Sequence, residues 1–253
     1  MSPIAETVIV FICVFASGLL GLYLRSVLPQ QHVHEDSLAM VRLCTGVIAT
    51  LTALVLGLLV ASAKGTYDRL SEQVTTSAAA VVLLDRTLAQ YGPETSEARS
   101  SLRAAVAASV STMFSAHAHG VADFDTREAL ARGENLQSEL RRLTPENDAQ
   151  RQLRARALEL ADQIAQTRML AITQAQSSLP PVFLVILVVW LSIMFAGFGL
   201  VTKNNLTVVI ALSLCALSVA GAVLMIEELN RPLEGLMKVP SEPLRYALAH
   251  LGQ

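Results

Sequence analysis

The chain has 253 residues, of which 53% are hydrophobic and only 16% are charged, and its mean hydropathy is +0.49. This composition excludes an ordinary water-soluble domain, so lipid is expected to be part of its solvent. The formal net charge of -2, with no basic tail, argues against a protein that binds nucleic acid through many phosphate contacts. Cys13, Cys44 and Cys215 all lie inside apolar runs, which argues against a disulfide framework or a zinc site.

Four apolar runs are long enough to cross a hydrocarbon core of about 30 Å, which takes about 20 helical residues. They extend from Thr7 to Leu24, Leu43 to Ala63, Val182 to Val201 and Leu206 to Ile226, and none contains a charged side chain. Because lipid offers backbone groups no hydrogen-bond partner, each run is predicted to be a membrane-spanning helix.

An even number of crossings places both termini, and the long interval between the second and third runs, on one side of the membrane. Basic residues near the membrane ends are more numerous on that side than on the other. That side has Lys64, Arg69, Arg168, Arg231, Lys238 and Arg245, whereas the other side has Arg25, Arg42 and Lys203. Basic residues accumulate on the cytoplasmic side of membrane proteins, so the interval and both termini are predicted to be cytoplasmic.

The interval is rich in Ala, Leu, Glu, Arg and Gln, which predicts a helical bundle. An apolar stripe at helical spacing continues directly from the second run, and it consists of Leu70, Val74, Val81, Leu84 and Leu88. The pattern predicts one continuous helix from about Val41 to Tyr91, which Gly92 and Pro93 stop.

Three further helices are predicted in the interval. One extends from Glu97 to His119, and a second begins near Asp125, where Asp-x-x-Glu fits a capping pattern. A third begins at Thr144, with Pro145 in its first turn. The chain therefore divides into a membrane pair (1–64), a cytoplasmic helical domain (65–180), a second membrane pair (181–227) and a cytoplasmic tail (228–253).

Small residues recur at every fourth position of the second run, and this stripe consists of Thr45, Ala49, Ala53, Gly57, Ala61 and Gly65. Small residues at that spacing let another helix approach closely in lipid. One interpretation is packing against the first or third membrane helix. The other is self-association around an axis, with Thr45, Thr52 and apolar neighbours such as Leu56 lining a narrow passage that dewets easily.

Two adjacent carboxylates, Glu227 and Glu228, end the fourth run. In one interpretation they lie in water at the helix end, where one pairs with Arg231 on the same helical turn. In the other, several subunits present them around the mouth of a pore, where they concentrate cations.

Other chemistry is sparse in the sequence. His32 and His34, followed by Glu35 and Asp36, are ligand types that suit zinc or copper, but a solvated or pH-responsive loop has the same composition. The sequence has no phosphate-cradling glycine loop, no metalloprotease motif and no nucleophile elbow. We therefore expect neither an enzyme nor a cofactor or a resident metal.

The second run with its continuation, "GVIATLTALVLGLLVASAKGTYDRLSEQVTTSAAAVVLLDRTL", and the tail "ELNRPLEGLMKVPSEPLRYAL" resemble a bacterial family of uncharacterised membrane proteins described as bestrophin-like. The tail motif is the more specific part, and its matching positions are Leu229, Pro232, Gly235, Ser241 and Pro243. Asn230 stands where the family pattern has an acid, and Leu233 stands where it has phenylalanine.

Bestrophins are pentameric ion channels with four spans per chain and a cytosolic helical region. The resemblance therefore implies a homo-oligomer, with a pentamer as the candidate, that conducts inorganic ions across the bacterial inner membrane. Together with the residue patterns, it predicts an all-α membrane protein with two pairs of transmembrane helices and a cytoplasmic bundle between them. The carboxylate pair favours cations. The alternative is a non-conducting scaffold or signalling protein whose cytoplasmic helices bind a partner.

Overall fold

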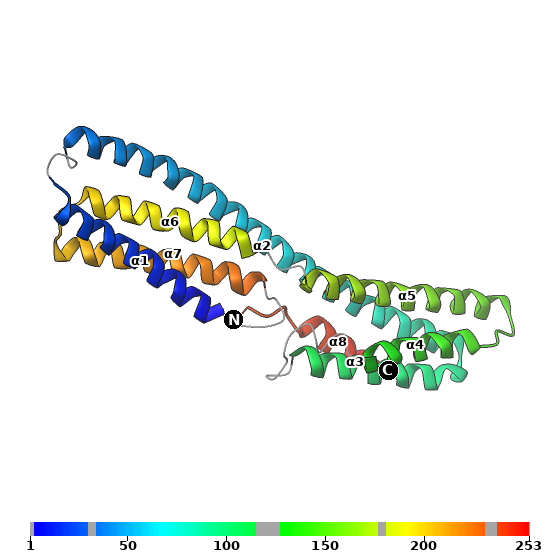
Figure 1. Ribbon diagram of the computed structural model, residues 1–253. Coiled ribbons are helices and arrows are strands. Elements are labelled where there is room, and N and C mark those ends of the chain that lie inside the picture. The colour runs from blue at the N-terminus through cyan, green and yellow to red at the C-terminus, as the bar shows by residue number, and fades with distance from the viewer. Residues whose placement is uncertain (1–2, 30–33, 115–126, 177–180, 231–236, 253) are drawn as a thin grey trace. The chain divides into compact units, whose positions relative to one another are not determined.

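The computed structural model describes residues 3–29, 34–114, 127–176, 181–230 and 237–252, and all regular structure in these ranges is helical. The chain separates into two compact units. We call residues 1–65 and 179–230 the apolar unit, and residues 66–178 and 231–253 the bundle unit. Figure 1 labels the helices in chain order.

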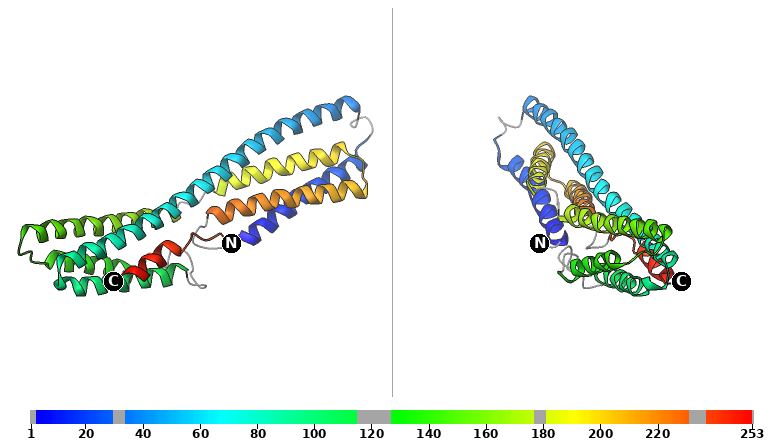
Figure 2. Two further views of the ribbon diagram at one scale, coloured as in Figure 1. Left: turned by 180° about the vertical axis from the view of Figure 1, so that it is seen from behind. Right: turned by 90° about the vertical axis from the view of Figure 1, so that its right-hand side faces the viewer.

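The apolar unit contains α1 (Pro3–Val27), the first part of α2 (Glu35–Tyr91), α6 (Pro181–Val201) and α7 (Leu206–Asn230). All four apolar runs of the sequence lie in these helices, each of which is long and apolar enough to cross a membrane. Helix α1 packs along both α6 and α7, as Figures 1 and 2 show.

Glycines bring α1 and α6 into backbone contact. A Cβ atom on Gly21 would lie 2.1 Å from the carbonyl oxygen of Ala196, and one on Gly199 would lie 2.2 Å from that of Gly18. Close approach of this kind holds helices together in lipid, where apolar side chains gain little by leaving the solvent.

An arginine of α1 completes this contact at one end of α6. The Nη1 atom of Arg25 donates to the carbonyl oxygens of Leu200 at 2.9 Å and of Val201 at 2.5 Å. These carbonyls lie in the last turn of α6, where the helix offers no amide partner, and the guanidinium places a positive charge at the negative end of the helix dipole.

Helix α2 is a single helix that begins in the apolar unit and ends in the bundle unit. The predicted continuity is confirmed, and the helix begins six residues before the predicted Val41. It ends at Tyr91 because Gly92 has φ +141°, in the left-handed region that favours glycine, and Pro93 then opens a short 3-10 turn, η2 (Pro93–Thr95).

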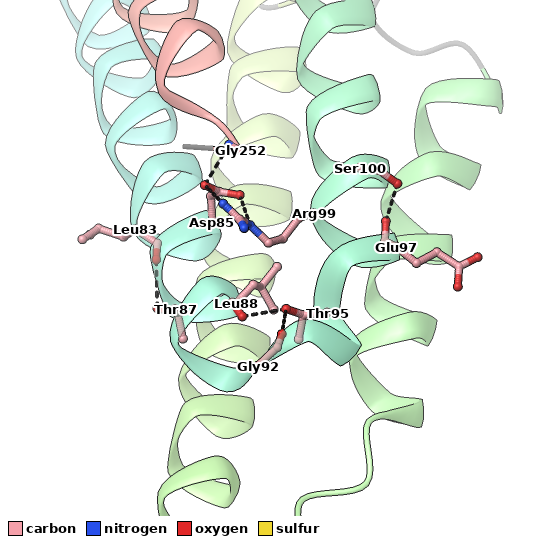
Figure 3. Close-up of polar contacts among 10 residues, drawn as sticks. All are labelled: Leu83, Asp85, Thr87, Leu88, Gly92, Thr95, Glu97, Arg99, Ser100 and Gly252. Atoms are coloured by element: carbon pink, nitrogen blue, oxygen red, sulfur yellow. Dashed lines mark hydrogen bonds and ion pairs between the residues drawn. The ribbon is translucent and has the colours of Figure 1, made fainter.

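The buried hydroxyl of Thr95 fixes this turn. Its Oγ1 lies 2.6 Å from the carbonyl oxygen of Leu88 and 2.8 Å from that of Gly92, and its hydrogen is donated to them (Figure 3). The end of α2 is thereby joined to the start of the next helix.

The bundle unit consists of the second part of α2 with α3 (Ser96–Phe114), α4 (Arg127–Arg142), α5 (Asp148–Gln176) and α8 (Glu242–His250). The predicted stripe of α2 is buried in its core, which α3 and α5 complete with Leu102, Val106, Ala157 and Leu160. Helix α3 begins one residue before the predicted Glu97, whereas His119 and Asp125 lie outside the described residues.

The last helix of the interval was predicted to begin at Thr144, and this is wrong, because α5 begins at Asp148. Asn147 caps it instead, since its Oδ1 accepts the backbone N–H of Gln150 at 2.8 Å. The side chain of Gln150 reaches back and accepts the N–H of Glu146 at 2.8 Å.

Candidate functional site

The apolar part of α2 has one face turned into the apolar unit. Its buried residues are Leu38, Thr45, Thr52, Leu59 and Ala63, which the helical repeat places on one side. Thr45 makes the closest approach, because a Cβ atom on Gly197 of α6 would lie 2.4 Å from its Oγ1. Thr45 and Thr52 therefore belong to the packing within the chain.

The stripe of small residues does not stay on that face. Four residues advance a helix by about 400°, so the stripe turns by about 40° at each step. Ala49 is half-buried, whereas Ala53, Gly57 and Ala61 are exposed, and no described residue beyond the local helix turns comes within 4 Å of a Cβ atom placed on Gly57. Only the start of the stripe packs inside the chain.

Large apolar side chains accompany these small residues on the exposed side of α2. Leu54 is 62% exposed and Leu58 is 63% exposed, whereas Leu56 is half-buried. We call Ala53, Leu54, Gly57, Leu58 and Ala61 the open face of α2. It carries no charged side chain, because the nearest ones in the sequence are Arg42 and Lys64.

The carboxylate pair lies inside a helix and not beyond its end. Helix α7 continues through Glu227 and Glu228 to Asn230, with Glu227 half-buried and Glu228 only 6% exposed. Glu228 is therefore buried within the chain, whereas Glu227 keeps some exposed surface. Arg231 lies outside the described residues.

The tail motif is distributed over two elements. Leu229 is buried and Asn230 is half-buried at the end of α7, and Pro243 lies in the first turn of α8. Pro232 and Gly235 lie outside the described residues.

His32 is also outside the described residues, and His34 directly precedes α2. Within the ranges that the structure describes, no three His, Cys, Asp or Glu side chains come together as a group that could hold a metal ion.

A buried ion pair in the bundle unit is the polar site that sequence reasoning missed (Figure 3). The carboxylate of Asp85 in α2 is 2% exposed and receives two hydrogen bonds from Arg99 of α3, Nε to Oδ1 at 2.8 Å and Nη2 to Oδ2 at 2.9 Å. The backbone N–H of Gly252, just after α8, donates to the same Oδ2 at 3.1 Å. The carboxylate thus joins three segments of the chain.

The surroundings of Asp85 keep it ionised. Burial alone would raise the pKa of the carboxyl, but the hydrogen bonds from Arg99 and Gly252 and the positive charges of Arg99 and Arg86 lower it below its ordinary value of 3.8. The pKa of Arg99 is raised, chiefly by its hydrogen bonds to Asp85.

The sequence did contain a signal for this site. Asp85 lies between Leu84 and Leu88 and four residues after Val81, so it interrupts the apolar stripe on its own face. An acid at such a position needs a buried cationic partner.

No curated protein matches the sequence, but solved structures share its fold. The chain resembles a bacterial Bestrophin homolog from Klebsiella pneumoniae in two variant crystal structures. The first is 14% identical, with a TM-score of 0.70 over 98% of this chain and 100% of that chain. The second is 15% identical, with a TM-score of 0.70 over 100% of this chain and 99% of that one. A third crystal structure, of a membrane protein, is 13% identical, with a TM-score of 0.70 over 96% of both chains.

The sequence also matches a protein family over most of its length. Residues 10–244 match the family described as "Bestrophin-like domain", a range that includes most of α1, the other three apolar helices, the helices between them and the start of α8. The chain belongs to the Bestrophin-like domain family.

Proposed function

We propose that this protein assembles into a homo-oligomer, with a pentamer as the candidate, that conducts inorganic ions across the bacterial inner membrane. Its four apolar helices cross the lipid, and the bundle unit and both termini are cytoplasmic. Family membership and the length and composition of the four helices support this proposal. The excess of basic residues near the ends that face the bundle unit supports the orientation.

The observation that carries the proposal is the open face of α2. Among the described residues, none outside the local turns of α2 lies within 4 Å of a Cβ atom placed on Gly57, and Leu54 and Leu58 are more than half exposed. Small residues on a membrane helix let another helix approach. Copies of α2 around an axis would enclose a narrow apolar passage, which conducts when water fills it and closes when it dewets.

Selectivity must then arise outside this passage, because the open face carries no charge. Of the two carboxylates at the end of α7, Glu227 retains exposed surface and is the candidate for the pore mouth, where it would favour cations. Replacement of Glu227 by Gln should lower the ratio of potassium to chloride permeability in bilayer recordings. A conducting variant with an unchanged ratio would exclude this role.

The pore itself is tested with a pair of glycines. Gly57 in α2 and Gly221 in α7 are both exposed, and in the described part of the chain neither has a residue from another helix within 4 Å of its Cβ position. In liposomes that contain the purified protein, Gly57→Leu should reduce ion flux at least tenfold or disrupt the oligomer, because the larger side chain enters the passage. Gly221→Leu should leave the flux and the oligomer mass unchanged.

Two outcomes would contradict the proposal. A wild-type oligomer that conducts neither potassium nor chloride would favour the non-conducting scaffold. Equal effects of the two substitutions would show that the open face of α2 has no special place in the assembly.

A further inference from the structure

The segment that follows the last apolar helix, Met237–Gly252, is docked on the bundle unit. Helix α8 packs against α3, and Val239, Leu244, Ala247 and Leu251 are buried in the same core as the stripe of α2. The hydroxyl of Tyr67 in α2 also donates to the carbonyl oxygen of Lys238 at 3.3 Å. We call Met237–Gly252 the tail segment.

Asp85 holds the far end of the tail segment. Its Oδ2 accepts both the Nη2 of Arg99 and the N–H of Gly252 (Figure 3). Gly252 has φ +85°, which a residue with a side chain rarely adopts. A backbone amide therefore reaches a buried charge through a turn that suits glycine.

The docking surface of the tail segment is small. Helix α8 has nine residues, and its outer side is open, with Tyr246 65% exposed. Ordering this segment costs backbone and side-chain entropy, against which it buries only a few apolar side chains. Segments of this kind open before the core of a domain does.

We propose that the tail segment is a releasable latch, locked by Asp85, and that its release alters ion conduction. The coupling rests on the proposed function. The tail segment follows α7 in the chain, after residues 231–236. Asp85 and the open face also belong to one continuous helix, α2.

Hydrogen exchange measured by mass spectrometry on the full-length protein tests the latch. Asp85→Ala removes the acceptor of both Arg99 and Gly252, and exchange of the α8 amides should become at least tenfold faster, with a clearly smaller acceleration in the peptides of α3 and α5. The matched control is Asp162→Ala, which removes an exposed carboxylate of the same unit that accepts a hydrogen bond from Gln137, and it should leave α8 unchanged.

A second variant covers the case in which Asp85→Ala does not fold. Leu244→Ser introduces a hydroxyl into the core contact of α8 while Asp85 and Arg99 stay in place, and it should also accelerate exchange in α8 alone. Unchanged α8 exchange in both variants would overturn the latch. Equal acceleration in α3, α5 and α8 would overturn it too, because the tail segment would then be an inseparable part of the bundle.

Ion flux from liposomes that contain the same variants tests the coupling. Flux through Asp85→Ala should differ at least threefold from that of the wild type and of Asp162→Ala. If α8 is released and flux is unchanged, the coupling is overturned. If the wild type itself conducts no ions, the proposed function fails and the coupling with it, and the exchange result alone decides whether the latch exists.

Discussion

The apolar unit and the bundle unit are both helical, yet they differ in how far their large apolar side chains are exposed. Among the described residues, those that the bundle unit exposes are Leu83, Met169, Leu170, Met237 and Tyr246, whereas the other exposed ones cover α1, α6, α7 and the apolar part of α2. The difference follows from the solvent, because an apolar side chain gains free energy by leaving water but almost none by leaving lipid.

Stability therefore has a different origin in each unit. In the bundle unit it comes from burial of the α2 stripe against α3 and α5. In the apolar unit it depends on close helix contacts such as that of Gly21 with Ala196. Substitutions matched across the two units test this contrast.

The largest effect is expected from truncation of the bundle core. Leu84 is fully buried, so Leu84→Ala should lower the free energy of unfolding by about 2–5 kcal/mol. Leu58→Ala, which truncates a side chain on the open face of α2, should change it by less than about 0.5 kcal/mol in detergent. Unfolding followed by circular dichroism checks the pair, and equal losses would contradict the contrast between the units.

A smaller effect is expected from a methyl group added between α1 and α6. Gly21→Ala places a Cβ atom against the carbonyl oxygen of Ala196, and it should cost about 1–3 kcal/mol as the helices move apart. Gly221→Ala meets open space and should be neutral or, through helix propensity, stabilising by up to about 1 kcal/mol. Unfolding midpoints in the same detergent compare the two, and a neutral Gly21→Ala would argue against the glycine contact.

The smallest effect concerns the charge of Asp85 and depends on pH. Asp85→Asn should cost about 1–2 kcal/mol at neutral pH, because the partly exposed Arg99 can still reach water. The folded protein holds the pKa of Asp85 below 3.8, so its stabilising contribution is complete above that pH and is lost as the pH falls through the folded value. The difference between wild type and Asp85→Asn should therefore be constant down to about pH 4 and shrink below it.

Unfolding measured across this pH range checks that prediction. A difference that persists unchanged to pH 2 would mean that ionisation of Asp85 does not stabilise the fold. Asp162→Asn, an exposed change in the same unit, is the control for general effects of acid.

Much of the fold could be predicted, because it follows from patterns along the chain. Four uncharged apolar runs predicted four helices, and the stripe from Leu70 to Leu88 predicted the buried face of α2. Gly92 and Pro93 predicted the end of that helix. The start of α5 was missed, because Thr144 and Asn147 both offer a capping side chain and only the folded backbone selects Asn147.

The candidate sites were less accessible to prediction. Thr45 and Gly57 belong to one sequence stripe, but the rotation of the helix turns the first inward and leaves the second open. Glu228 is buried and Glu227 is half-buried, a difference between adjacent carboxylates that the sequence does not reveal. Asp85 was overlooked because its partners lie on other segments of the chain, Arg99 on α3 and Gly252 just after α8.

The sequence by itself determined the helical class, the four runs suited to lipid and the buried stripe of the bundle, because hydrophobicity and helical periodicity act over a few turns of one chain segment. Only the tertiary structure decided which side of α2 stays open, where Glu228 points and how Asp85 joins α2, α3 and the tail segment. These features depend on which helices become neighbours, and packing geometry and the pairing of buried charges determine this between residues far apart in the chain.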